Sequence, residues 1–178
     1  MAYRNKTYIA GDWDKDKEAV DQLRIWNDSN YWGLDFYDVH SSIQTNSEKP
    51  CTIKKSLGER LDNSKHFVLI VGESTKNLTK GKCSISCSDN LYCKNSKSEK
   101  SYIQFECDGA KKRLENDNLP KIIVLYKSAS IDKSKCPDSI KDIALTHAKM
   151  YKYENGKYYW DYQSVKTAFD KFKAVVLA

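Results

Sequence analysis

The chain has no long apolar stretch. Nowhere in its 178 residues is there a run approaching the roughly 18 apolar residues that a membrane-spanning helix requires. The amino-terminal residues 1–7 also lack the apolar core of a signal peptide. We therefore expect a cytoplasmic protein with no membrane partner. The six cysteines would then meet a reducing environment, where thiols or metal ligands are more common than disulfides.

Several catalytic motifs are missing as well. The segment 10–15 reads AGDWDK after the first apolar run, so the glycine fingerprint of dinucleotide-binding oxidoreductases is absent. No GxxxxGK[ST] phosphate loop and no GxSxG nucleophile elbow occur. A phosphoacceptor receiver would need an aspartate after the third apolar run, where Gly72 and Glu73 stand instead. These absences argue against four common α/β enzyme and signalling classes.

The charge gives little support to nucleic-acid binding. The net charge is +6, from 30 basic and 24 acidic residues, but the basic residues are nearly all lysines and are scattered among the acids. A nucleic-acid interface normally gathers its basic residues into one patch or stripe. The richness in Lys, Asn, Tyr and Ile is typical of an AT-rich genome. We therefore expect no nucleic-acid partner.

Short apolar segments alternate with helical patterns along the chain. The unbroken runs 67–71 and 122–126 are typical of strands buried on both faces. Apolar residues recur at helical spacing between and after the runs. The expected strands are 8–10, 34–37, 67–71, 122–126 and 150–153, and the expected helices carry apolar stripes within 19–26, 53–61, 103–114, 140–144 and 165–176. An Asn155-Gly156 turn should separate the last strand from the last helix.

This alternation predicts one α/β domain over residues 1–178. Its fold would be a flavodoxin-like, doubly wound parallel sheet of order 2-1-3-4-5, with helices on both faces. Ligands of such sheets bind outside the carboxyl ends of the strands, where the strand order reverses. The segments expected at that edge are 11–15, 38–45, the residues from Gly72 onward, and the helix start at Ser101.

A polar insertion at about 76–100 contains three cysteines, Cys83, Cys87 and Cys93. Three thiols within eleven residues suggest a structural zinc site, for which a fourth ligand would be needed. That ligand would come from Cys51, Cys107, Cys136 or a histidine. Cys107 itself lies on an apolar helical stripe and is also interpreted as a small core residue. The alternative is a surface loop with free thiols and no metal.

An ordered set of segments resembles a known family. The segments are FYDVHS at 36–41, IKKSLGERLDNSK at 53–65, the run 67–72, YIQFE at 102–106 and the run 121–126. Together they are similar to the TIR-like proteins of bacterial Thoeris-type antiphage defence, over about residues 6–127. The resemblance implies a flavodoxin-like fold and a hydrolase-type enzyme that cleaves NAD at the nicotinamide glycosidic bond. NAD would be the substrate, with no cofactor required. The product would be a cyclic or otherwise modified ADP-ribose, a diffusible signal for a downstream effector.

The resemblance assigns the catalytic role to Glu106, which stands four residues after an aromatic residue, here Tyr102. Read from the residues alone, the two form an i, i+4 pair near a helix start, where the helix dipole would keep a carboxylate ionised. A fixed negative charge suits the chemistry because departure of nicotinamide leaves an oxocarbenium-like ribose. The alternative is a solvated glutamate in a first helical turn.

Two further groups are candidate substrate-binding residues. Asp38 and His40 follow the second expected strand as D-x-H, a pattern that the resembling proteins share, although a turn-forming aspartate and a surface histidine are alternatives. Gly11, Asp12 and Trp13 follow the first strand, where the backbone could approach a phosphate and Trp13 could stack on a base. A packing role for Trp13 is favoured from the residues alone.

Two other classes of function stay open at this stage. One is a non-catalytic TIR-like interaction module, and the other is a binding domain whose cysteine-containing loop is held by a metal ion. Self-association into a homo-oligomer is also left open.

Overall fold

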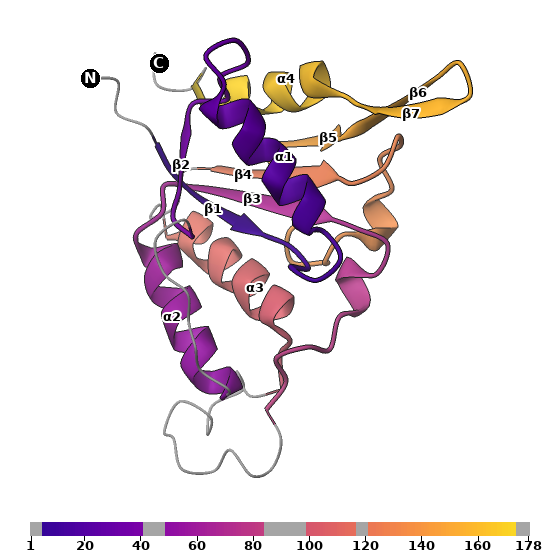
Figure 1. Cartoon of the computed structure of the whole chain (residues 1–178). Helices are drawn as coiled ribbons and strands as arrows, with labels where there is room; N and C mark the ends of the chain where they lie inside the picture. The colour runs from indigo at the N-terminus through magenta and orange to yellow at the C-terminus, as the bar shows by residue number, and fades with distance from the viewer. Residues whose placement is uncertain (1–4, 41–48, 84–98, 117–120, 174–178) are drawn as a thin grey trace.

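The computed structural model describes residues 5–40, 49–83, 99–116 and 121–173 (Figure 1). Its centre is a five-stranded sheet in which every neighbouring pair of strands is parallel. The strand order is β2-β1-β3-β4-β5. The strands are β1 (Asn5–Ala10), β2 (Phe36–Asp38), β3 (His66–Val71), β4 (Lys121–Tyr126) and β5 (Thr146–Lys149). The predicted flavodoxin-like α/β fold and its strand order are confirmed.

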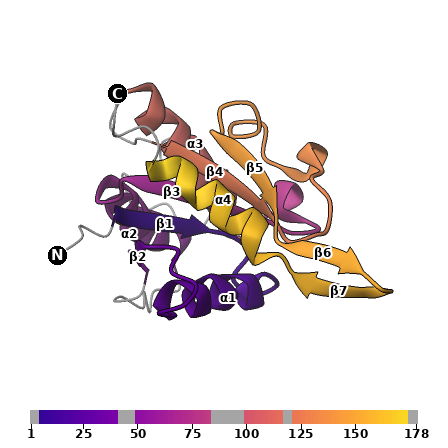
Figure 2. The same cartoon turned by 90° about the horizontal axis from the view of Figure 1, so that it is seen from above.

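Helices cover both faces of this sheet, two on each side (Figures 1 and 2). One pair, above the sheet in Figure 1, is α1 (Lys17–Asp28) and α4 (Tyr162–Lys173). The other pair, below it, is α2 (Pro50–Asp62) and α3 (Tyr102–Glu115). Two short 3-10 helices, η1 (Thr75–Asn77) and η2 (Lys133–Lys135), lie in the connections.

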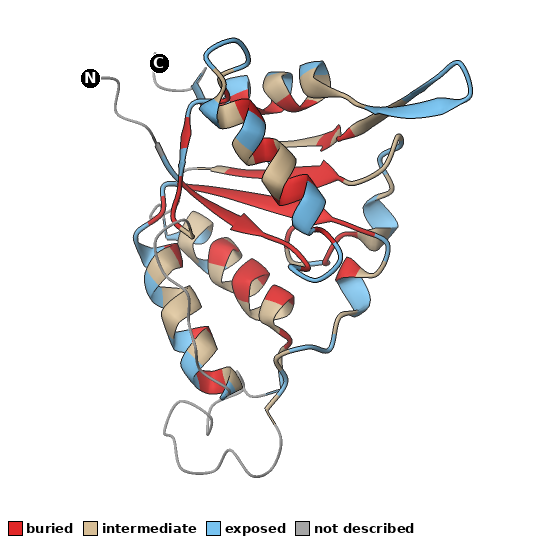
Figure 3. Cartoon of the chain, viewed as in Figure 1, coloured by how far each residue is buried: buried red, intermediate tan, exposed pale blue. Residues whose placement is uncertain are grey.

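The apolar runs form the central strands because both of their faces are covered. Along β3, Val68 and Ile70 pack into the layer of α1 and α4, whereas Phe67, Leu69 and Val71 pack into the layer of α2 and α3. This division follows from the two-residue period of a strand. All six residues of β3 are buried, and the middle of the sheet is continuously red in Figure 3.

The helical stripes fall on the sheet as predicted for three of the four long helices. α1 buries Ala19, Leu23 and Trp26, α3 buries Ile103, Cys107 and Ala110, and α4 buries Val165, Phe169 and Phe172. In α2 the stripe is less deeply buried, since only Leu61 is fully covered and Ile53 and Leu57 are half-buried. Residue Val176 of the predicted last stripe lies outside the described residues.

The predicted last strand is wrong. The fifth strand of the sheet is Thr146–Lys149, and most of the segment 150–153 forms β6 (Tyr151–Glu154), which pairs with β7 (Lys157–Trp160) in an antiparallel hairpin. The Asn155-Gly156 turn joins these two strands instead of a strand and a helix, with φ angles of 51° and 78°. β5 has no apolar run because it is an edge strand, in which only Ala148 is buried.

Two smaller predictions are corrected. The segment 140–144 forms successive turns that begin at Pro137, although its Ile140 is buried as expected. The second strand begins at Phe36, later than predicted, because Asp35 has a positive φ of 63° that interrupts the extended backbone.

The described part of the insertion lies at the surface. Residues 76–83 are all exposed or half-buried, and residues 84–98 lie outside the described residues. Among the helices that the structure describes, none is both long and apolar enough to cross a membrane.

Candidate active site

A cleft of about 250 Å³ lies at the carboxyl end of β1. The loop after β1, helix α2, the segment after η1 and the first turns of α3 all contribute to it. Its wall is mostly apolar, with two buried carboxyl groups, those of Asp12 and Glu106. The lining residues are Gly11, Asp12, Trp13, Ile53, Leu57, Leu78, Lys80, Tyr102, Ile103 and Glu106. Five of the predicted site residues therefore meet in one place, at the edge of the sheet where the strand order predicts a ligand.

Glu106 lies in the second turn of α3, which begins after the cap residue Ser101. The Glu106 side chain is almost completely buried, and the hydroxyl of Tyr8 donates a hydrogen bond of 2.6 Å to its Oε1. Burial raises the pKa of Glu106 to about 8, although the Tyr8 hydrogen bond and the Arg60 guanidinium act in the opposite direction. Near neutral pH the free site thus holds mostly a protonated carboxylic acid.

This state corrects the sequence-based view of Glu106. The residue is neither a solvated glutamate in a first turn nor a carboxylate kept ionised by the helix dipole. The dipole acts mainly within the first turn, and Glu106 is one turn further along. Loss of hydration dominates there because, among the residues that the structure describes, no cationic group contacts the carboxyl directly.

Tyr8 joins Glu106 to His40. The Tyr8 ring is completely buried in β1, and its centroid lies 4.4 Å from that of His40 in an edge-on contact. On another side it stacks on Phe67, with 5.7 Å between ring centroids. Burial and the neighbouring Glu106 both raise the Tyr8 pKa well above 10, so the hydroxyl remains a donor.

His40 is neutral at physiological pH. Burial lowers its pKa to about 4, helped by the nearby Arg60 and Arg24 and opposed by Asp38. Because Arg60 Nη1 can only donate, the 3.1 Å contact makes His40 Nδ1 an acceptor and leaves the proton on Nε2. Within the part of the chain that the structure describes, this buried Nε2 has no hydrogen-bond partner. His40 is therefore a half-buried residue whose Nε2–H is an enclosed donor near the cleft.

Asp38 positions the segment that carries His40. One oxygen, Oδ1, accepts from the backbone N–H of His40 at 2.8 Å. The other, Oδ2, accepts from Nε and Nη2 of Arg24, at 2.9 and 2.7 Å. The Arg24 guanidinium also lies 5.5 Å from the centre of the Trp13 ring. Asp38 thus acts through its neighbours and does not line the cleft.

Trp13 forms a partly open wall of the cleft. It is 37% exposed, and its ring lies 5.6 Å from His40 in addition to the contact with Arg24. The loop that carries it is held by Asp16, whose Oδ2 accepts from the backbone N–H of Asp12 at 3.3 Å. Asp16 fits against Gly72, where a Cβ atom would lie 2.4 Å from Oδ1. Gly72 therefore permits the close approach that fixes this loop.

Tyr102 fixes the opposite wall. Its backbone N–H donates to the carbonyl of Lys80 at 2.9 Å. Its ring lies so close to Gly81 that an added Cβ would be 2.5 Å from ring atoms. The segment after η1 is therefore held on the start of α3, which brings Leu78 and Lys80 to the cleft.

Sequence reasoning missed Tyr8, Arg24 and Arg60. Tyr8 is predicted only as part of a short strand, yet a hydroxyl-bearing ring in a strand covered on both faces needs a buried hydrogen-bond partner. No sequence pattern identifies the two arginines as site residues, because their pairing with Asp38 and His40 depends on the packing of α1 and α2.

The zinc hypothesis is not tested by the described residues. Cys83 is half-buried, whereas Cys87 and Cys93 lie outside the described residues. Among the described residues, no group of three or more His, Cys, Asp or Glu side chains could hold a metal ion. Cys51, Cys107 and Cys136 are buried, as predicted for Cys107. A zinc site that involves Cys87 and Cys93 stays a prediction.

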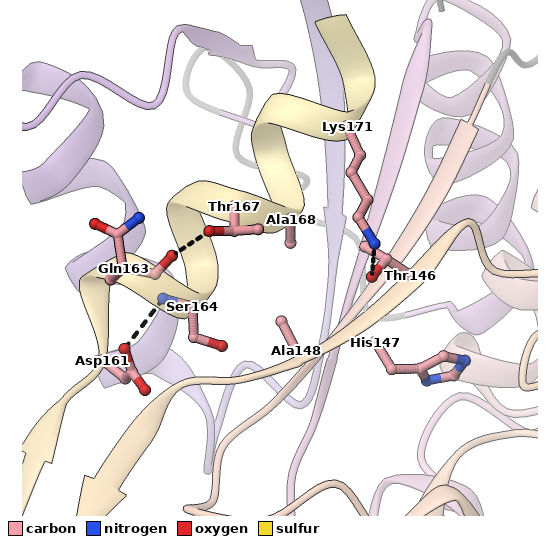
Figure 4. A pocket seen from close by; sticks show the side chains of 9 residues that line it. All are labelled: Thr146, His147, Ala148, Asp161, Gln163, Ser164, Thr167, Ala168 and Lys171. Atoms are coloured by element: carbon pink, nitrogen blue, oxygen red, sulfur yellow. Dashed lines mark hydrogen bonds between the residues drawn. The ribbon is translucent and has the colours of Figure 1, made fainter. Parts of the chain in front are cut away.

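A second cleft, of about 410 Å³, lies between β5 and α4 (Figure 4). Its polar groups largely satisfy one another. Lys171 Nζ donates to Thr146 Oγ1 at 3.1 Å, and Asp161 Oδ1 accepts from the N–H of Ser164 at 3.0 Å. None of the predicted site residues lines it, and it lacks a buried carboxyl group. It is therefore a weaker candidate for a catalytic site.

The family model of the Thoeris protein ThsB, TIR-like domain, matches residues 7–97, about half of the chain. The chain belongs to this family. It is thus a TIR-like protein of antiphage defence. No curated protein sequence matches the chain. The segment matched to the ThsB family contains Gly11, Asp12, Trp13, Asp38 and His40, whereas Tyr102 and Glu106 follow it, so their place in the site rests on geometry.

Proposed function

We propose that this ThsB-family chain is an NAD-consuming enzyme of the glycohydrolase or cyclase type, with Glu106 as its catalytic carboxyl group. The observation that carries the proposal is the buried Glu106 side chain in a cleft at the carboxyl edge of a parallel sheet. Strongly perturbed carboxyl groups in clefts are characteristic of catalytic sites. Family membership supports the same conclusion.

The reaction breaks the bond between the ribose carbon and the nicotinamide nitrogen. The bonding electron pair leaves with nicotinamide, which becomes neutral, and positive charge develops on the ribose. An ionised Glu106 would stabilise that charge or accept a hydrogen bond from a ribose hydroxyl. Tyr8 holds Oε1, while Oε2 makes no hydrogen bond within the described residues and is the oxygen available to substrate.

Substrate charge would supply the ionised state that the free site lacks. The nicotinamide ring of NAD is cationic, and an opposite charge nearby favours a carboxylate over a carboxylic acid. Binding of NAD and loss of the Glu106 proton are therefore linked. Neutral His40 adds no competing positive charge, and its Nε2–H offers a donor beside Tyr8.

The size and lining of the cleft suit one end of the substrate. Its 250 Å³ is below the roughly 300–1,000 Å³ of sites that enclose a drug-sized ligand. Trp13, Ile53, Leu57 and Leu78 offer apolar surface to a planar ring. Lys80 adds an ammonium group, which in the free chain pairs with the exposed Asp14 and would turn to a phosphate group of the substrate. We infer that the nicotinamide riboside end enters the cleft and that the rest of the dinucleotide lies outside it.

The product proposed for this reaction is a cyclic or modified ADP-ribose that acts on a separate effector protein. The acceptor at the ribose carbon, water or another nucleophile, determines which product forms. Mass spectrometry of nucleotides from phage-infected cells that express the chain would identify it.

The decisive test compares Glu106→Gln with Glu115→Gln in the same assay. Glu115 is exposed at the end of the same helix, so its substitution makes the same chemical change away from the cleft. We expect Glu106→Gln to lose about 100-fold or more in NAD turnover, equivalent to about 3 kcal/mol in the barrier, while Glu115→Gln keeps wild-type activity.

The assay requires protein in its activated state, from infected cells. Equal turnover by wild type and Glu106→Gln would refute the role of Glu106. An activated wild type that consumes no NAD would favour the rival function, a non-catalytic interaction module in which Tyr8 and Glu106 form a structural pair.

A further inference from the structure

The β6–β7 hairpin projects from the end of the sheet (Figures 1 and 2). Each of its strands has four residues, and among the described residues they form a sheet with one another alone. The outward backbone N–H of Tyr151 donates to the carbonyl of Ser128 at 3.1 Å. Much of the hairpin is exposed in Figure 3. A two-stranded hairpin with no further strand beside it is at best marginally stable by itself. Beyond the hydrogen bond between Tyr151 and Ser128, the hairpin therefore offers an open strand edge at the surface.

One face of the hairpin carries four aromatic rings in two cross-strand pairs. The inner pair, Tyr151 and Trp160, is stacked at 4.4 Å and is anchored on the domain by the contact of Trp160 with Trp26. The outer pair, Tyr153 and Tyr158, has 4.8 Å between centroids. These two rings are 58% and 67% exposed. Large exposed aromatic surface of this kind is typical of protein interaction sites.

The backbone of Tyr153 also lacks a partner. The two-residue turn closes on the pair Glu154 and Lys157, which places Tyr153 and Tyr158 opposite one another in the next pair. Because hydrogen-bonded and non-hydrogen-bonded pairs alternate in an antiparallel ladder, the N–H and C=O of Tyr153 point away from β7. No hydrogen bond to either group occurs within the described residues. This edge can accept another strand.

The charges along β6 identify a suitable strand. Tyr153 has Lys152 on one side and Glu154 on the other. If β6 pairs antiparallel with a copy of itself about Tyr153, Lys152 faces the partner's Glu154, and Glu154 faces the partner's Lys152. Opposite charges directly across a strand pair stabilise it, whereas like charges destabilise it. A second, antiparallel copy of β6 thus matches the first in its backbone N–H and C=O groups and in its charges.

We propose that two copies of this chain associate through β6, which forms a continuous four-stranded sheet from two hairpins. The two Tyr153 residues lie opposite one another on the two-fold axis. Only one short strand from each copy forms the contact, so the interface falls below the roughly 1,200 Å² of a stable complex. The association is therefore weak and depends on concentration. It is independent of the proposed NAD chemistry.

Charge reversal gives a sharp test by sedimentation velocity. The average sedimentation coefficient of the wild type should increase as the protein concentration is raised about a hundredfold, because dimers form. Lys152→Glu and Glu154→Lys should each remain monomeric, because each places like charges opposite one another. A mixture of the two variants should associate again, since all facing charges are then opposite, and the double variant should behave as the wild type.

Two controls complete the test. Lys111→Glu on α3 changes the net charge by the same amount as Lys152→Glu and should leave association unchanged. Tyr153→Pro removes the outward N–H, which an edge strand tolerates, and should abolish association with an unchanged melting temperature. A wild type that is monomeric at every concentration would overturn the proposal and leave the edge to a different protein. A mixture no more associated than its separate components would also overturn it.

Discussion

The two sides of the central sheet are packed with different chemistry. The layer under α1 and α4 is an apolar cluster rich in aromatic rings, in which Phe169 contacts both Phe36 and Phe172. A buried titratable group on this side, His66, lies at the amino-terminal end of β3 and stacks on Phe172 at 4.1 Å. The layer under α2 and α3 instead contains Glu106, bonded to Tyr8 in the middle of its apolar residues.

The difference shows which buried group lowers the stability of the fold. A carboxyl group removed from water without a cationic partner destabilises the folded state, whereas a buried ring stabilises it. The destabilising group lies at the carboxyl end of β1, next to the cleft. Both layers thus supply apolar burial, and the layer under α2 and α3 uses part of it to hold a protonated acid where a substrate can reach it.

The largest expected effect is the loss of a ring from the apolar layer. Phe169→Ala removes a completely packed side chain, which stacks on Phe36 with 5.4 Å between centroids. We expect the free energy of unfolding to decrease by about 3–5 kcal/mol, from lost burial and the resulting cavity. Urea unfolding followed by circular dichroism measures it. A decrease below about 1 kcal/mol would show that ring packing under α1 and α4 contributes little to the stability of the fold.

The second prediction concerns the other layer and has the opposite sign. The pKa of Glu106 is about 8 in the folded protein, against an ordinary value of 4.5 for a glutamate exposed to water, as in the unfolded chain. Between these values the folded state binds more protons, so its stability decreases as the pH increases from about 4.5 to 8. Glu106→Gln removes this titration and should stabilise the protein by on the order of 3 kcal/mol at pH 7.

Urea unfolding of both proteins at several pH values tests this. The gain should be small near pH 4 and should increase towards pH 8, while Glu115→Gln shows no such trend. A destabilised Glu106→Gln variant would mean that the carboxyl group belongs to the structural core, as the rings of the first layer do.

The sequence predicts the fold well where burial is two-sided. The runs in β3 and β4 and the stripes of α1 and α3 suffice for the flavodoxin-like order. It fails at β5, an edge strand whose four residues THAK include one buried residue, Ala148. It also fails at the hairpin, whose tyrosines resemble a buried strand. Alternation and apolar runs carry information only where side chains are packed.

The sequence predicts the position of the candidate site but not the protonation state of its carboxyl group. The end of β1 and the start of α3 could be placed at one edge from strand order alone. The protonation of Glu106 could not, because it depends on how completely Tyr8, Ile103 and the segment after η1 exclude water. The roles of Arg24 and Arg60 likewise depend on contacts between residues 14 and 20 positions apart in the sequence.

The smallest expected effect comes from Tyr8→Phe, a change within the layer under α2 and α3. The ring and its contacts with Phe67 and His40 are retained, and only the hydroxyl that donates to Glu106 is lost. The unsatisfied carboxyl oxygen should cost about 1–2 kcal/mol in unfolding free energy. Because the hydrogen bond lowers the pKa of Glu106, its loss should raise that pKa further above about 8.

Activity provides the second measurement on the same variant. If the ionised Glu106 is the active form, kcat/KM of the activated wild type increases with pH to a plateau above about 8. In Tyr8→Phe this increase should move to higher pH, and the plateau should be reduced less than in Glu106→Gln. A Tyr8 with only a structural role would lower stability and leave the midpoint of the pH profile unchanged. The shift of that midpoint therefore distinguishes a residue that positions and tunes the catalytic carboxyl from one that only fills the layer.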